Sequence, residues 1–348
     1  MLASKHKELF VEAGTFSLLS ATASSSSSPL IIEQLFETPM QADWSAFEGH
    51  VENLIGGKGQ RFVSSRCGIY PESRFFRRFS IESAAKAKEP NFFPTVLAEQ
   101  MRIDLNTHLA TVVNASSGSQ FDVGKPLANQ KEVLIAGLGT ADRQAAQDRL
   151  VQAGIYPASL QLGTLSTIGA LMHYMRFRQL ERPTLLLELT PGDANLFILS
   201  GQQVDVARPI PYGLNSMFPL IQKELGLRDE ASAKKLFFSN TFDFTEMGGT
   251  LLRKMLKELQ ASTGFYEVQT GKTIGQIFVS LLPKNLSWIE TVLSRSLGVP
   301  LLRVDCEPWL ESAGIRGGSE VQLANLDNRW FGLLSLMLNL EEAGHATA

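Results

Sequence analysis

The sequence predicts an α/β fold of two related lobes, each built on a mixed β-sheet flanked by helices. Two observations lead to this prediction. Three short apolar runs followed by a helix occur near the amino terminus, and the same pattern returns from Arg182 onward. The length of 348 residues also exceeds what one hydrophobic core usually supports. A repeat of this length indicates duplication of a domain rather than a solenoid.

The first copy opens with three expected strands. They cover Leu9 to Val11, Phe16 to Thr22 and Leu30 to Phe36, and Gly14 and Pro29 mark the turns between them. A helix follows, because apolar residues recur at the spacing of one helix face at Trp44, Phe47, Val51 and Leu54. The segment 61–69 then predicts a fourth strand.

The middle of the chain has a different pattern, which indicates an inserted unit. Segments 75–82 and 131–140 are typical of strands, and 94–103 is typical of a helix with a proline in its first turn. Thr140 is expected to cap a further helix that ends at Gly154. A mostly apolar helix over 161–180 leads into the second copy.

The second copy repeats strand, glycine turn, strand, strand and helix. We expect its strands at 182–189, 194–203 and 204–213, and its helix shows an apolar face at Met217, Leu220, Ile221 and Leu225. Further helices are expected at 229–238, 249–269 and 286–298, and further strands at 274–282 and 299–305.

Charge and cysteine content exclude several classes of function. The net charge of −3 and the absence of long Lys/Arg runs argue against a nucleic-acid partner. Cys67 and Cys306 lie far apart without a neighbouring cysteine, so neither a zinc site nor a disulfide framework is expected, and a reducing cytoplasm fits.

No stretch has the length and composition of a membrane span or a signal peptide. The most apolar stretch, Trp330 to Leu340, is followed by acidic residues. It is therefore interpreted as a buried C-terminal helix, with docking on a membrane surface as the alternative.

The order of elements in the second copy resembles the actin-like ATPase superfamily, and closely its PilM branch of type IV pilus assembly proteins. The residues that carry the resemblance are Ser200-Gly201, Arg208 with Ile210, Gly213, and Glu230-Ala231 with Lys235. The secretion protein GspL and the division protein FtsA are similar too, but GspL has a transmembrane helix and FtsA an amphipathic membrane-binding tail that this sequence does not show.

The resemblance implies an actin-like (ribonuclease H-like) fold, with two lobes of duplicated mixed sheets and a small inserted α+β subdomain. The expected divisions are the first part of the first lobe at 1–70, the inserted subdomain at 71–153, the return helix of the first lobe at 154–181, the second lobe at 182–328 with helices at about 213–270, and a C-terminal helix and tail at 329–348.

The resemblance also implies a location and a partner. The protein is expected in the cytoplasm, peripheral to the inner membrane, where it binds the cytoplasmic N-terminal tail of a PilN-like protein that crosses the membrane once. Membrane association would come through that partner alone, and self-association is possible.

In this superfamily two glycine turns, one in each lobe, hold the phosphates of a nucleotide. The corresponding residues here are Glu12, Gly14 and Thr15 in the first turn, Glu188, Gly192 and Asp193 in the second, and Lys235 on a later helix. Glu12 and Glu188 would hold Mg²⁺ if a nucleotide binds. No catalytic residue is assigned.

Several residues depart from the superfamily pattern. Pro191 removes an N–H group that a phosphate would need, and Asp193 brings a negative charge to the same place. No glycine occurs from Pro283 to Leu286, where adenine is expected to lie close to the backbone. Glu12 and Glu188 could equally be solvated carboxylates at strand ends.

These departures favour a scaffold of a type IV pilus or type II secretion-like platform with a degenerate nucleotide site, for which ATP and Mg²⁺ are not required. An active Mg-ATP-binding ATPase or phosphotransferase is the first alternative. An FtsA-like filament or division protein is the second.

Overall fold

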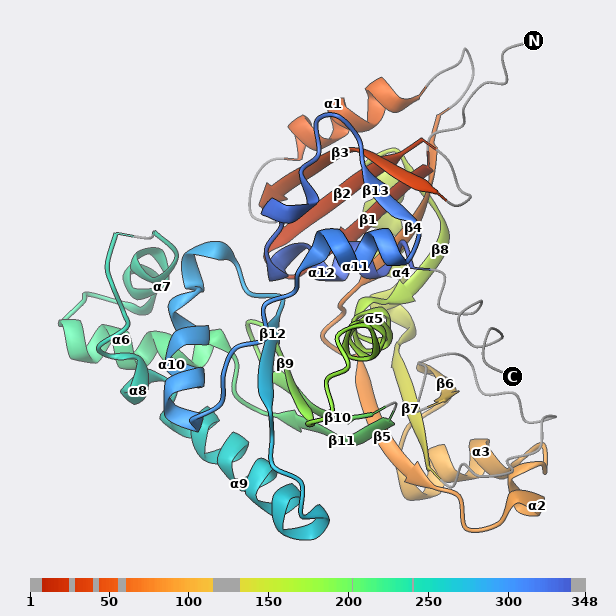
Figure 1. Ribbon diagram of the computed structural model, residues 1–348, viewed down its shortest axis with the longest axis vertical. Coiled ribbons are helices and arrows are strands. Elements are labelled where there is room, and N and C mark those ends of the chain that lie inside the picture. The colour runs from red at the N-terminus through yellow and green to blue at the C-terminus, as the bar shows by residue number, and fades with distance from the viewer. Residues whose placement is uncertain are drawn as a thin grey trace.

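The computed structural model describes residues 8–24, 29–39, 44–55, 61–114, 132–201, 203–239 and 241–338. Two lobes and a smaller subdomain are arranged around helix α5, Gly163–Phe177 (Figure 1). The expected tail beyond residue 338 lies outside the described residues.

The first lobe contains a six-stranded sheet in the order β13-β3-β2-β1-β4-β8. Strands β1, β2 and β3 are antiparallel, whereas β4 and β8 run parallel to β1 and β13 runs parallel to β3. The strands are β1 Glu8–Ala13, β2 Ser17–Ala23, β3 Leu30–Pro39, β4 Val63–Ile69, β8 Ile155–Leu162 and β13 Ile315–Gly317.

The second lobe contains a four-stranded sheet in the order β11-β10-β9-β12. Its strands are β9 Thr184–Leu189, β10 Ala194–Ser200, β11 Gln203–Ile210 and β12 Gln276–Ser280. The antiparallel set β11-β10-β9 and the parallel neighbour β12 repeat the order and directions of β3-β2-β1-β4. The predicted two-lobed α/β fold with duplicated mixed sheets is therefore confirmed.

A separate antiparallel sheet, in the order β5-β7-β6, lies beside the edge strand β11 of the second lobe (Figure 1). It consists of β5 Phe75–Ser80, β6 His108–Asn114 and β7 Glu132–Gly139. Short helices α2 Ala84–Ala87 and α3 Phe92–Thr95 accompany it, and α3 continues as the π-helical turn η1, Val96–Gln100.

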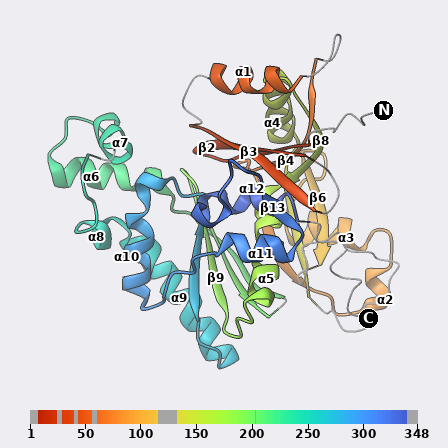
Figure 2. The same cartoon turned by 45° about the horizontal axis from the view of Figure 1, so that its top comes forward.

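The other helices belong to the two main lobes. In the first lobe these are α1 Ser45–Leu54, α4 Thr140–Gln152, α11 Cys306–Ser312 and α12 Phe331–Ser335. In the second lobe they are α6 Phe218–Leu225, α7 Glu230–Phe238, α8 Gly248–Leu251, α9 Arg253–Thr270 and α10 Trp288–Leu297. Single 3-10 turns lie at Leu214–Met217, Lys284–Leu286, Leu323–Asn325 and Asn328–Trp330. Helices α6, α7 and α8 group at the end of the molecule away from α2 and α3 (Figure 2).

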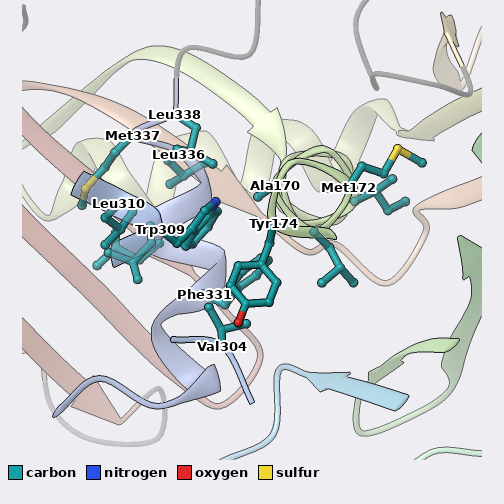
Figure 3. Close-up of a cluster of buried hydrophobic side chains, with 14 of the residues drawn as sticks. Ala170, Met172, Tyr174, Val304, Trp309, Leu310, Phe331, Leu336, Met337 and Leu338 are labelled. Atoms are coloured by element: carbon teal, nitrogen blue, oxygen red, sulfur yellow. The ribbon is translucent and has the colours of Figure 1, made fainter. Parts of the chain in front are cut away.

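The largest core cluster joins the C-terminal helices to α5 (Figure 3). The ring of Trp309 stacks on Phe331 with centroids 5.2 Å apart, and Tyr174 contacts the same indole edge-on. The expectation of a buried C-terminal helix is confirmed, although α12 ends at Ser335. None of the helices in the described ranges is long and apolar enough to span a bilayer.

Two local expectations were wrong, and some elements, β8 among them, were not expected. Segment 299–305 forms a single bridge, from Leu301 to Ile277, because the chain turns away into α11. Thr140 is the first residue of α4 and makes no side-chain cap, since Gly139 occupies the capping position. Strand β8 was not expected, because Pro157 falls within it and a proline inside an apolar run argues against a strand.

Candidate functional site

The ends of β1 and β9 bring together two carboxyl groups, one from each lobe. Glu12 and Glu188 are 3% and 1% exposed, so the alternative that they are solvated carboxylates is wrong. They occupy matching positions in the two copies, because β1 and β9 take the same place in their sheets. Each side chain must therefore find its partners within the protein.

The Glu12 carboxyl group is held between Tyr70 and the C-terminal helix. The Tyr70 hydroxyl donates to Glu12 Oε1 over 2.8 Å. A Cβ added at Gly332 would lie 1.9 Å from the same oxygen, so α12 requires glycine where it crosses Glu12. Burial raises the pKa of Glu12 to about 7, against the lowering effects of Tyr70 and the Leu333 amide.

Glu188 instead forms a buried ion pair. Arg74 donates to Glu188 Oε1 through Nε at 3.0 Å and through Nη2 at 2.5 Å. Thr164 donates to the other oxygen at 2.7 Å, and Asn195 Nδ2 lies 3.4 Å from Oε1. Both side chains of the ion pair are 1% exposed, so the negative charge of Glu188 is compensated inside the protein.

Arg74 lies in the short link between β4 and β5, and it connects three parts of the molecule. Its Nη1 atom donates to the carbonyl of Pro71 at 2.9 Å. Burial alone would lower the pKa of Arg74, but the carboxylates of Glu188 and Asp193 raise it above its usual value. The guanidinium group therefore stays charged between the lobes, where the superfamily pattern expects a metal ion beside the carboxylates.

The first turn joins β1 to β2 and is tight. The Gly14 amide donates to the Ser17 carbonyl at 3.0 Å. Thr15 Oγ1 is buried and has no hydrogen-bond partner among the described residues. The Phe16 ring reaches the second lobe, where its centroid lies 5.9 Å from that of Phe238 on α7.

The second turn, from Thr190 to Asp193, is closed by its own hydrogen bonds. The Thr190 amide donates to the Asp193 carbonyl, and the Asp193 amide donates to Thr190 Oγ1. The Thr190 hydroxyl lies 2.6 Å from the Asp193 carboxylate. Pro191 has no N–H group, so Gly192 is the residue of this turn whose amide makes no hydrogen bond within the turn.

A small cavity of about 20 Å³ lies between the first turn and the segment that follows β12 in the second lobe. Glu12, Phe16, Leu282, Pro283 and Arg329 are among the residues that line it. Ligand pockets usually enclose about 300–1,000 Å³. This cavity is too small to hold a nucleotide.

The structure brings together most of the expected site residues. Glu12, Gly14 and Thr15 adjoin the same interlobe space, and the charges of Glu188 and Asp193 both act on Arg74. Gly192 lies exposed in the turn beside Asp193, whereas Lys235 is exposed on α7 and no described contact places it at the carboxyl groups.

A larger pocket opens on the other side of the first turn. It measures about 360 Å³ and lies between the first turn, the end of β4 and one face of α4. Its lining residues are Ala13, Gly14, Thr15, Trp44, Ile69, Tyr70, Pro71, Glu72, Asp142, Ala145, Ala146, Arg149 and Leu150. The Arg149 guanidinium lies 4.0 Å from the centroid of the Trp44 ring, so a cation and an aromatic surface meet at this pocket.

Sequence reasoning missed Tyr70, Arg74 and Thr164. Each is a common residue outside any motif, and each reaches the carboxyl groups only through the tertiary fold. Within the described ranges, no group of three or more His, Cys, Asp or Glu residues is placed to hold a metal ion.

Two duplicated mixed sheets, with Glu12 and Glu188 at matching strand ends, define an actin-like fold. The chain matches a solved PilM–PilN type IV pilus biogenesis complex with a TM-score of 0.67 and 16% identity, over 96% of this chain and 98% of the other. The fold expected from the resemblance to PilM is thereby confirmed. No family model and no curated protein sequence matches the chain.

Two more distant structures were also found. A protein of Bacteroides thetaiotaomicron with an actin-like ATPase fold gives a TM-score of 0.44 at 9% identity, over 97% of this chain and 98% of that one. The cytoplasmic domain of EpsL, from the type II secretion system of Vibrio cholerae, gives 0.41 at 10% identity, over 98% and 96%. Scores this low support no functional argument.

Proposed function

We propose that this protein is a scaffold of an inner-membrane assembly platform of the type IV pilus or type II secretion kind. In this role it binds the cytoplasmic tail of a PilN-like membrane protein. It works in the cytoplasm and reaches the membrane through that partner. The observation that carries the proposal is the pocket between the first turn and α4, on a chain with the fold of PilM from the PilM–PilN complex.

The chemistry of the pocket suits an anchor residue of a peptide. Trp44, Ile69 and Ala146 present apolar surface, and Asp142 and Arg149 add one charge of each sign. A volume of about 360 Å³ holds a large side chain with adjoining backbone. An extended tail would place apolar side chains here and pair its own polar groups at the rim.

The scaffold role does not require ATP or Mg²⁺ in this proposal. Arg74 already compensates the charge of Glu188, and the Thr190 hydroxyl accepts a hydrogen bond from the Asp193 amide of the second turn. The Phe16 ring and Pro283 take up the space between the lobes. These contacts support the proposal that the nucleotide site of the superfamily serves here to hold the two lobes together.

Isothermal titration calorimetry with a synthetic N-terminal tail of the PilN-like partner tests peptide binding. Ala145→Trp should lower the affinity by about tenfold or more, since Ala145 is exposed and lines the pocket. Gln144→Trp is the matched control, because Gln144 is exposed on the same helix outside the pocket lining. Equal affinity in both variants, or no binding by the natural chain, would refute the proposal.

The converging carboxyl groups Glu12, Glu188 and Asp193 favour the Mg-ATP-binding alternative, and a thermal-shift scan separates it from the scaffold role. A ligand that binds the native state raises the melting temperature by mass action. We expect no shift with Mg-ATP at concentrations up to about 1 mM, the upper range of common substrate constants. A saturable shift that Glu188→Gln abolishes would establish nucleotide binding instead.

A further inference from the structure

Helix α9 presents an apolar stripe to solvent on the face opposite its buried side. Phe265 is 65% exposed and Val268 is 87% exposed, and Ala261 lies one turn before Phe265 on the same face. A Cβ added at Gly264 would meet nothing within 4 Å, so this part of the helix is open. The opposite face is already used, because Met255, Leu259 and their neighbours are buried in the second lobe.

Basic residues continue the stripe toward the amino end of α9. Lys254 and Lys257 are exposed and lie seven and four positions before Ala261, which is two turns and one turn of the helix, on the same face. Arg253 adds a further exposed charge, and Lys272 follows the carboxyl end. The acidic residues of the helix are engaged elsewhere: Glu258 pairs with Arg208, and Glu267 accepts a hydrogen bond from the Ile274 amide.

These charges are poorly placed for helix stability. Cations at the first turn oppose the positive end of the helix dipole, and α9 has no acidic residue in that turn. The N-cap residue Leu252 provides no side-chain hydrogen bond either. The basic cluster therefore has no evident role in holding the helix and is free to attract a negatively charged partner.

The position of α9 narrows the choice of partner. In both views α9 runs along the lower edge of the molecule and projects beyond its neighbours (Figures 1 and 2). Its apolar residues stand on a convex helix surface, which a bilayer accommodates because lipids rearrange around it. Lysines beside exposed aromatic and aliphatic side chains are the pattern of an interfacial helix on anionic lipid.

We propose that the exposed face of α9 docks on an anionic lipid surface. Phe265 and Val268 enter the headgroup region, and Lys254 and Lys257 approach the lipid phosphates. Such contact is weak alone and adds to tethering by a membrane partner through effective concentration. It is independent of the peptide pocket, so either activity can be present without the other.

Co-sedimentation of the full chain with vesicles tests this docking. Binding should occur with vesicles of phosphatidylglycerol mixed with phosphatidylcholine, should weaken with added salt, and should be lost with phosphatidylcholine alone. Phe265→Ser/Val268→Ser and, separately, Lys254→Ala/Lys257→Ala should each lower binding by about tenfold or more. Tyr156→Ser is the control, because Tyr156 is a similarly exposed ring on β8.

Three results would overturn the proposal. One is absence of sedimentation by the natural chain with anionic vesicles, and another is equal binding by the α9 variants and the control. The third is a concentration-dependent dimer in analytical ultracentrifugation that Phe265→Ser dissolves, which would assign the face to a second copy of the chain. Unchanged melting temperatures and unchanged tail-peptide binding would show that the variants are folded and that the pocket is separate.

Discussion

The two lobes place a glutamate at the same point of the same strand pattern, yet the two carboxyl groups exist in different electrostatic surroundings. Glu12 faces a phenol and a helix backbone, and its pKa rises to about 7. Glu188 faces a guanidinium group that compensates its charge. Duplication therefore preserved the backbone, while residues far away in sequence determine the charge at each position.

Removing the Arg74 cation from the second-lobe site should lower the free energy of unfolding more than any other change. Arg74→Ala leaves Glu188 as an uncompensated buried charge, and we expect a loss of about 3–5 kcal/mol in the free energy of unfolding. Chemical denaturation measures it. In the double variant Arg74→Met/Glu188→Gln both charges are absent, so most of the stability should return. A single variant that loses less than about 1 kcal/mol would contradict the buried ion pair.

The pH dependence of stability distinguishes the first-lobe carboxyl group. Its pKa is raised from 4.5 to about 7, so the native state holds a proton that the unfolded chain releases. The stabilisation by the neutral Glu12 carboxyl group is complete below pH 4.5. As the pH rises to about 7, it is lost and the free energy of unfolding falls by about 3 kcal/mol. Glu12→Gln should remove that decline in denaturant titrations across this range. Parallel curves for variant and natural chain would show that Glu12 ionises normally.

The contact of α12 with Glu12 predicts a steric effect. In Gly332→Ala the new methyl group meets the Glu12 carboxyl group, which should cost about 1–3 kcal/mol in thermal or chemical unfolding. Gly264→Ala is the matched control within a helix, because its methyl group meets open space and should stabilise the protein by up to about 1 kcal/mol. Similar losses in both variants would contradict the close crossing.

The smallest expected change in the free energy of unfolding comes from removing one hydrogen bond at each of the two sites. Thr164→Val removes a donor to a charged carboxylate, which typically costs about 1.5–3 kcal/mol. Tyr70→Phe removes a donor to the largely neutral Glu12 carboxyl group at pH 6, which costs about 0.5–1.5 kcal/mol. Denaturation at pH 6 should rank them in that order, and the reverse order would reject the contrast between the sites.

Much of the fold could be predicted from sequence, because local patterns specify its main elements. The apolar runs at β1 to β3 and β9 to β11, and the helix spacing of α1, need no distant partner to be recognised. Strand β8 was missed because Pro157 falls within it, and a proline inside an apolar run argues against a strand. It forms because β4 offers a parallel edge, which only the tertiary structure reveals.

The candidate site was predictable only in part. The turns could be placed because Glu12 and Glu188 follow matching strands. Their chemistry could not, because Tyr70, Arg74 and Thr164 lie 58, 114 and 24 residues from the carboxyl groups that they contact. Lys235 was named by motif position, and only the fold places it on an exposed helix face.

The edge strand β13 has a consequence for the order in which the chain folds during synthesis. It pairs with β3, and α12 packs against β1 and β2, so residues near 315–335 complete a sheet that begins at residue 8. The second-lobe sheet needs only residues 184–280. During translation the second lobe can therefore finish its sheet while β3 still has a bare edge open to mispairing. The first lobe is therefore synthesised first, but its sheet is completed last.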